Sequence, residues 1–155
     1  MEDLKNFITK TVNESKFDYP SYTSNRIVKL FKNVKTFGEF FIAWDCVYNG
    51  EEPVKCTSRN LLKCITSDNY GMASNILYDG GDTMREVSNA YYGDKNKIND
   101  IDDFEDFIIE HKNDKIINID ISDPNMHDEC DIVLDIADWN DYCRIGYIVS
   151  DDLED

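Results

Sequence analysis

Residues 37–50, Phe-Gly-Glu-Phe-Phe-Ile-Ala-Trp-Asp-Cys-Val-Tyr-Asn-Gly, form the stretch that decides the fold. Their large apolar side chains recur every three or four residues, which is the period of one face of an α-helix. Asn49 and Gly50 then supply a typical helix stop signal. Because the stretch is rich in aromatic residues, we expect it to form the helix around which the core is built.

Helical periodicity continues on both sides of this stretch. One later segment has Thr83 and Glu86 at the spacing of a capping box and ends at Gly93, while another follows Asp100 as a candidate N-cap. Residues 69–78 fit either a helix or a loop. We therefore expect five to six helices in all. Besides the stretch above, the expected helices cover residues 4–13, 24–34, 58–65, 83–92 and 100–111.

The last of these helices separates apolar from acidic side chains. Ile101, Phe104, Ile108 and His111 recur at helical spacing and should form its buried stripe. Three carboxylates share a different face, because residues three and four apart are neighbours on a helix. We call these three residues the helical acidic row: Asp103, Asp106 and Glu110.

After Asn113 the hydrophobic period changes from near 3.6 to 2, which indicates β-strands. Isoleucines 117, 119 and 121 alternate with polar residues, and residues 132–136 and 143–149 show the same alternation. We expect three short strands in an antiparallel meander, with one face packed on the helices. The middle segment also fits a helical turn.

The predicted fold class is α+β, with N-terminal helices followed by a three-stranded antiparallel sheet. We expect one domain over residues 1–155, divided into a mainly helical part, 1–99, and an acidic helix-plus-sheet part, 100–155. The polar run 93–99 is the candidate boundary between the two parts.

The acidic part carries the whole net charge of the chain. Residues 100–155 contain 19 Asp or Glu and 3 Lys or Arg, a difference of −16, while residues 1–99 contain 13 of each sign. Like charges gathered on a folded surface repel one another, so a segment this acidic indicates a cationic partner or bound metal ions.

Several classes of protein are disfavoured. The acidic N-terminus does not resemble a signal peptide, and no apolar run approaches the roughly 20 residues of a membrane-spanning helix. Five cysteines without disulfide-framework spacing indicate reduced thiols. We therefore expect a cytoplasmic protein with no membrane association.

No catalytic motif is present either. The chain lacks Gly-x-Ser-x-Gly and a Walker-type loop, and one of its two histidines, His111, belongs to an apolar helical stripe. We therefore expect neither an enzyme nor a cofactor. In the acidic loop 123–131, the side chains of Asp123, Asn125, Asp128 and Asp131 could coordinate a hard cation. A metal-binding module or metal-dependent enzyme is therefore an alternative, against the simpler interpretation of a solvated turn.

The charge also decides between kinds of partner. Affinity for nucleic acid comes mainly from Lys and Arg, so direct nucleic-acid binding is disfavoured, whereas carboxylates at regular intervals can replace phosphates in a basic groove. The leading hypothesis is an inhibitor that binds a basic nucleic-acid-binding protein, namely a nuclease, restriction enzyme or CRISPR effector, by charge mimicry. An immunity protein or antitoxin against a nuclease toxin is the alternative. The simplest interpretation is a solvated acidic face that only aids solubility.

The candidate partner-binding residues form three sets. The helical acidic row is the first. The second set, the strand acids, lies on the predicted strands, and the third, the turn group, lies between the last two strands. Trp139 is the expected aromatic anchor, because burial is hard to arrange in a turn. The strand acids are Asp120, Asp131 and Asp135, and the turn group is Asp138, Trp139, Asp141 and Tyr142.

Overall fold

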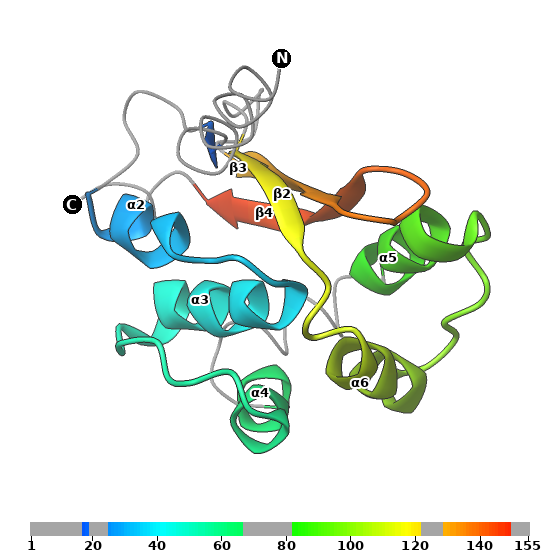
Figure 1. Cartoon of the computed structure of the whole chain (residues 1–155), viewed down its shortest axis with the longest axis horizontal. Coiled ribbons are helices and arrows are strands. Elements are labelled where there is room, and N and C mark those ends of the chain that lie inside the picture. The colour runs from blue at the N-terminus through cyan, green and yellow to red at the C-terminus, as the bar shows by residue number, and fades with distance from the viewer. Residues whose placement is uncertain (1–16, 19–24, 67–81, 122–128, 150–155) are drawn as a thin grey trace, which may run out of the picture.

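Five helices precede an antiparallel sheet of three strands, as the sequence predicts (Figure 1). The computed structural model describes residues 17–18, 25–66, 82–121 and 129–149. The predicted helix 4–13 and the segment 69–78 lie outside these residues. The helices are α2 (Asn25–Lys32), α3 (Phe37–Asn49), α4 (Ser58–Ile65), α5 (Asp82–Tyr92) and α6 (Ile101–Glu110). The three strands are β2 (Ile116–Ile121), β3 (Glu129–Ile136) and β4 (Cys143–Val149).

The sheet contains one strand that the sequence pattern did not predict. A two-residue strand, β1 (Phe17–Asp18), pairs in parallel with β2, which gives the order β1-β2-β3-β4. The other two pairings are antiparallel, with Leu134 of β3 opposite both Ile119 and Cys143. The middle predicted segment is therefore a strand and not a helical turn.

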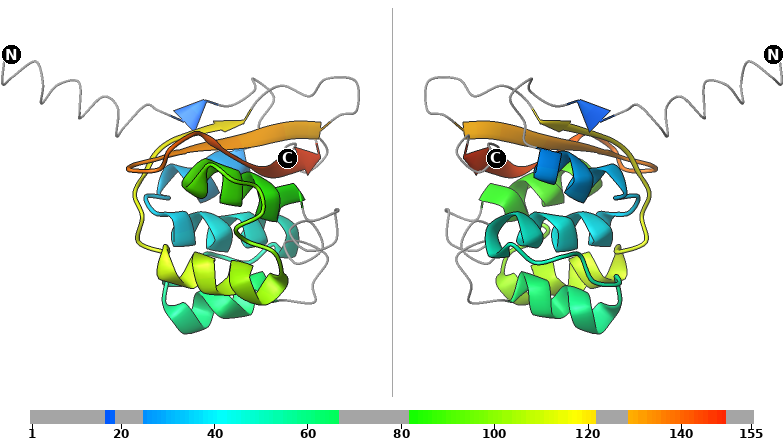
Figure 2. Two further views of the ribbon diagram at one scale, coloured as in Figure 1. Left: turned by 90° about the vertical axis from the view of Figure 1, so that its right-hand side faces the viewer. Right: turned by 90° about the vertical axis from the view of Figure 1, so that its left-hand side faces the viewer.

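The helices lie on one side of the sheet. In both side views α2 and α5 are next to the sheet, α3 is beneath them, and α4 and α6 are farthest from the strands (Figure 2). This arrangement places α3 in the middle of the molecule. It also places α6, which carries the helical acidic row, far from the strand acids.

The central position of α3 follows from its sequence and its caps. Thr36 accepts a hydrogen bond from the Glu39 amide at 3.2 Å, and the Glu39 carboxylate accepts one from the Thr36 amide at 3.1 Å. This capping box satisfies amide groups that the first helical turn leaves unpaired. At the other end Gly50 adopts a left-handed conformation with φ of 74°, as the predicted stop requires.

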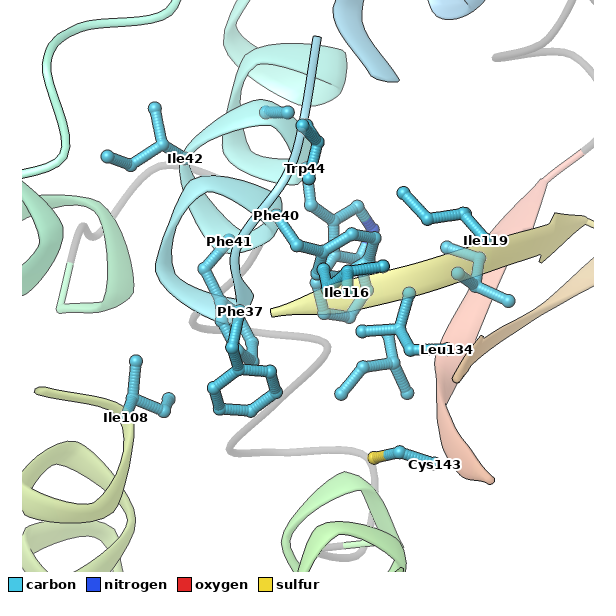
Figure 3. Close-up of a cluster of buried hydrophobic side chains, with 14 of the residues drawn as sticks. Phe37, Phe40, Phe41, Ile42, Trp44, Ile108, Ile116, Ile119, Leu134 and Cys143 are labelled. Atoms are coloured by element: carbon cyan, nitrogen blue, oxygen red, sulfur yellow. The ribbon is translucent and has the colours of Figure 1, made fainter. Parts of the chain in front are cut away.

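The core joins α3 to the sheet. The side chains of Phe37, Phe40 and Trp44 are fully buried, and those of Phe40 and Trp44 point toward β2 (Figure 3). Edge-to-face packing of Phe37 on Phe41, with ring centroids 4.9 Å apart, extends the cluster toward α6. Each fully buried side chain of this size contributes about 1.5–3 kcal/mol. Thus α3 is buried on nearly every side, as expected for a helix that is apolar around its circumference.

One inward-facing strand residue differs from the prediction. Ile116, and not Ile117, is buried with Ile119 and Ile121. The reason is a register shift between Ile116 and Asn118 in the pairing with β3, which places an extra residue in β2. Such a bulge moves the side chains before it to the other face of the sheet.

The predicted capping role of Thr83 is wrong. The helix begins at Asp82, so Thr83 is already inside α5. Its buried hydroxyl donates a hydrogen bond of 2.7 Å to the carbonyl of Ile145 in β4. Thr83 therefore attaches the helix to the sheet instead of capping the N-terminus of the helix.

The polar run 93–99 is fixed to α5. The buried Ser88 hydroxyl donates to the carbonyl of Asp94 and accepts from the amides of Lys97 and Ile98. The Ile98 side chain is itself part of the hydrophobic core. The hydrogen bonds of Ser88 and the buried side chain of Ile98 therefore attach this exposed segment to the fold.

Candidate functional site

The helical acidic row has the predicted exposure. Asp100 caps α6, because its carboxylate accepts a hydrogen bond of 2.8 Å from the Asp103 amide. Asp103, Asp106 and Glu110 are all exposed. The opposite side of α6 is buried against the core through Phe104, Phe107 and Ile108.

Two strand acids lie on the face of the sheet that points away from the helices. Asp120 is opposite Val133 and Asp135 is opposite Asn118, and they alternate with the buried Ile119 and Leu134. Both carboxylates are half-buried. The third strand acid, Asp131, is the register partner of Tyr147, and its side chain lies outside the described residues.

The turn group contains the most exposed large aromatic side chain among the described residues. Tyr142 is 64% exposed, and Asp138 and Asp141 beside it are exposed as well. Asp138 has a φ of 69°, a left-handed conformation that Asn and Asp tolerate better than most residues. The turn therefore presents two carboxylates and a tyrosine ring to solvent.

Trp139 is less buried than Trp44, as its place in a turn predicts, but it is not fully exposed. Its ring is partly buried, with centroids 5.0 Å from Phe37, 5.3 Å from Tyr91 and 5.6 Å from Phe107. The turn folds back onto α5 because the amides of Asn140 and Asp141 both donate to the carbonyl of Ala90 at 3.1 Å. Tertiary packing thus covers a residue that its local sequence places in a loop.

Trp139 also belongs to a polar junction. Its indole Nε1 donates a hydrogen bond of 2.9 Å to Asp114 Oδ2, and His111 Nδ1 lies 2.8 Å from the same oxygen. The imidazole stacks on Phe107, with centroids 4.2 Å apart, and contacts Tyr91 at 4.6 Å. His111 is therefore packed and oriented as a structural histidine at the edge of the core, as its place on the apolar stripe predicts.

An open hollow of about 390 Å³ adjoins this junction, and we call it the turn pocket. The sequence analysis identified Asp138 and Trp139 among its residues, but it missed Tyr91 and Asp114. No spacing signal connects them, because they come from three segments that meet only in the folded chain. The lining residues are Tyr91, His111, Asn113, Asp114, Lys115, Ala137, Asp138 and Trp139.

The acids do not share one face. Asp120 and Asp135 lie on the outer side of the sheet, while α6 belongs to the layer farthest from it (Figure 2). The turn group is closer to the end of α6, because Trp139 contacts Phe107 and His111. The structure thus divides the candidate residues into separate surfaces. One of them, which we call the turn surface, is formed by the turn group and combines carboxylates with aromatic rings.

A second hollow, of about 470 Å³, lies between α2, α3 and the segment after α3. Its charges are mixed, since its lining includes Arg26 and Lys29 as well as Glu39, Glu51 and Glu52. The Arg26 guanidinium already donates to the carbonyls of Cys46 and Val47. This hollow therefore shows no preference for a ligand of either charge.

Two of the described thiols, those of Cys46 and Cys64, are unsuited to nucleophilic chemistry. Cys46, Cys56, Cys64 and Cys143 are free in the part of the chain that the structure describes. Burial raises the pKa of Cys46 to about 11 and that of Cys64 to about 12, so both are protonated at neutral pH. The thiolate is the reactive form of cysteine, and these sites disfavour it.

The described residues contain no group of three His, Cys, Asp or Glu side chains arranged to hold a metal ion. Most of the acidic loop 123–131 falls outside the residues that the structure describes, so the metal alternative for this loop stays untested. Within the described ranges, no helix has the length and apolar character needed to cross a bilayer. No family model, curated protein or solved structure matched the chain.

Proposed function

We propose that this protein is an acidic inhibitor that binds a cationic nucleic-acid-binding protein and blocks its nucleic-acid site by charge mimicry. The target class is a nuclease, restriction enzyme or CRISPR effector. The observation that carries the proposal is the exposure of the acidic part: the carboxylates of the helical acidic row and of the turn group are all open to solvent. In a basic groove they would release the same counterions as nucleic-acid phosphates do.

The turn surface is the best candidate for the centre of the interface. Binding energy in protein interfaces concentrates in a few residues, among which Tyr, Trp and Arg are enriched. Tyr142 is 64% exposed beside Asp141, and Tyr92, at the end of α5, is 47% exposed. Carboxylates around such rings would guide a basic partner, while the rings would supply most of the affinity.

The proposed activity is binding without chemistry, in the cytoplasm, where thiols stay reduced. Two features support this view: the raised pKa of the Cys46 and Cys64 thiols and the packed position of His111. An immunity protein or antitoxin would use the same contacts. A toxin gene beside the coding sequence would favour that alternative.

The test begins with the purified protein on a solid support, exposed at low salt to a lysate of its natural host. We expect a basic protein to bind, to elute as salt rises, and to be displaced by duplex DNA or RNA. The isolated partner should lose nucleic-acid binding when the protein is added. Retention that is insensitive to salt, or that nucleic acid does not displace, would contradict charge mimicry.

Three neutralised variants then locate the interface. One changes the helical acidic row to Asn, Asn and Gln, another changes Asp120 and Asp135 to Asn, and the third changes Asp138 and Asp141 to Asn. Asn is chosen at position 138 because it tolerates the positive φ there. We expect the third variant to weaken binding most, with the Asp120 and Asp135 variant as the control matched for the loss of two charges. Unchanged binding in all three would contradict the proposal.

The metal alternative has its own measurement. A cation held by the loop 123–131 in the folded protein must raise the midpoint of thermal unfolding. Calcium, magnesium, manganese and zinc are titrated separately, with Asp123→Asn and Asp128→Asn as variants of the loop. A midpoint that rises in the parent and not in the variants would favour the metal-binding module over the inhibitor.

A further inference from the structure

The turn pocket combines three aromatic rings with two carboxylates. The rings belong to Tyr91, His111 and Trp139, and the carboxylates to Asp114 and Asp138. They come from the end of α5, the segment after α6 and the turn between β3 and β4. The volume of about 390 Å³ is within the range of about 300–1,000 Å³ that is usual for ligand pockets.

The aromatic walls are held rigidly. Tyr91 and Trp139 meet edge to face with centroids 5.3 Å apart, and both rings also contact Phe107. His111 is stacked on Phe107 and hydrogen-bonded to Asp114. A wall fixed in this way loses little side-chain entropy when a ligand binds.

The carboxylates give the pocket its charge preference. Both hydrogen bonds to Asp114 end on Oδ2, so its other oxygen, Oδ1, takes part in neither of them. Asp138 is exposed at the rim. Among the described residues that line the pocket, Lys115 is the one lysine or arginine, so carboxylates outnumber it two to one.

We propose that the turn pocket binds the guanidinium group of an arginine side chain. A guanidinium is planar, is weakly hydrated, stacks on aromatic rings and donates paired hydrogen bonds to a carboxylate. The compact, strongly hydrated ammonium of lysine matches such walls less well. That this arginine belongs to a basic nucleic-acid-binding protein rests on the proposed function, whereas the chemistry of the pocket does not.

The proposal gives the inhibitor a specific means of action. Arginine contacts phosphates and hydrogen-bonds guanine in many nucleic-acid-binding proteins. An arginine that enters the turn pocket is no longer available to nucleic acid. Tyr142 in the turn and Tyr92 at the end of α5 are both exposed, and they would then contact the partner around this arginine.

The test uses the two tryptophans of the chain as reporters. The indole N–H signals of Trp44 and Trp139 are followed by NMR in the full-length protein, and Trp139→Phe assigns them. The probes are N-acetyl-arginine amide, the lysine analogue and the neutral isostere N-acetyl-citrulline amide. We expect a saturable shift of the Trp139 signal with arginine, at least tenfold weaker binding of citrulline and weaker binding of lysine. The buried Trp44 signal should not move.

Two variants complete the experiment. Asp138→Asn should weaken arginine binding several-fold, while Asp135→Asn, which removes an acid outside the pocket, should leave it unchanged. Equal responses to arginine and citrulline, equal responses to arginine and lysine, or equal loss in both variants would overturn the proposal. If the pocket fails but salt-sensitive partner binding persists, the proposed function survives; if the pocket binds arginine but no partner is displaced by nucleic acid, only the proposed function falls.

Discussion

Trp139 Nε1 donates a hydrogen bond of 2.9 Å to Asp114 Oδ2, and this contact joins the turn between β3 and β4 to the segment that leads from α6 into β2. The backbone amide of Phe37 donates to the carbonyl of the same Asp114 at 2.9 Å. Asp114 therefore connects the turn, the end of α6 and the start of the central helix α3. The wall of the turn pocket is thus part of the structure that holds the fold together.

We expect Trp139→Phe to lower the free energy of unfolding by about 1–2 kcal/mol, since it removes a hydrogen bond to a partly exposed carboxylate and keeps an aromatic ring in place. For a chain of this length, 1 kcal/mol corresponds to a shift of about 2–4 °C in Tm. Urea unfolding of Trp139→Phe, Asp114→Ala and the double variant measures the coupling between the two residues. An equal cost of Trp139→Phe with and without Asp114 would show that the hydrogen bond contributes nothing.

Gly38, in the first turn of α3, has no room for a side chain. A Cβ at this position would lie 2.7 Å from both Cys56 Sγ and Lys112 Cβ, and 3.0 Å from the Lys112 carbonyl oxygen. Helix propensity alone predicts that Gly38→Ala stabilises the protein by up to about 1 kcal/mol. We expect the opposite sign, a loss of about 1–3 kcal/mol, because the contact with the Lys112 backbone forces α3 away.

Chemical denaturation of Gly38→Ala decides between these signs. The double variant Gly38→Ala/Cys56→Ala removes the sulfur contact and keeps the backbone contact. We expect Gly38→Ala to cost less stability when Cys56 is already Ala than it costs in the parent protein, but still to be destabilising. If the Gly38→Ala variant is as stable as the parent or more stable, α3 does not approach Lys112 as closely as the structure indicates.

The fold was predictable where local sequence decides it. The change of hydrophobic period near Asn113 separates helices from strands, and Asn49-Gly50 ends α3 as expected. Strand β1 was missed because two residues show no period. The buried Ile116 was missed because the bulge in β2 depends on pairing with β3, which no local pattern reports.

The candidate site was predictable only in part, for a similar reason. Exposure of the helical acidic row follows from helical spacing, which a single segment contains. The division of the acids among separate surfaces depends on where α6 packs relative to the sheet. The turn pocket depends in addition on contacts between Tyr91 and Trp139, which are 48 positions apart in the sequence.

Thr83 offers a test of how α5 is attached to the sheet. Thr83→Val removes the hydroxyl that donates to Ile145 and keeps the side-chain volume, so the Ile145 carbonyl loses a buried partner. We expect a loss of about 1–3 kcal/mol. Thr83→Ser keeps the hydroxyl and loses one methyl group, for which about 1 kcal/mol is expected. Urea denaturation of both variants makes the comparison, and a smaller loss for Val than for Ser would refute the role of the hydrogen bond.

Asp45 gives the pH dependence of stability a definite sign. It is 5% exposed within α3, and desolvation raises its pKa above the ordinary 3.8, opposed by a hydrogen bond with Cys64 and assisted by Glu51. The folded protein therefore binds this proton more tightly than the unfolded chain, and the contribution of Asp45 to stability falls as pH rises from 3.8 through the raised pKa. Each pKa unit of the rise corresponds to about 1.4 kcal/mol.

Asp45→Asn mimics the protonated acid, so it should stabilise the protein at pH 7 and have little effect near pH 4. Urea denaturation of parent and variant at both values isolates Asp45 from the other carboxylates, and an Asn variant less stable than the parent at pH 7 would mean that the ionised carboxylate is stabilised by its surroundings.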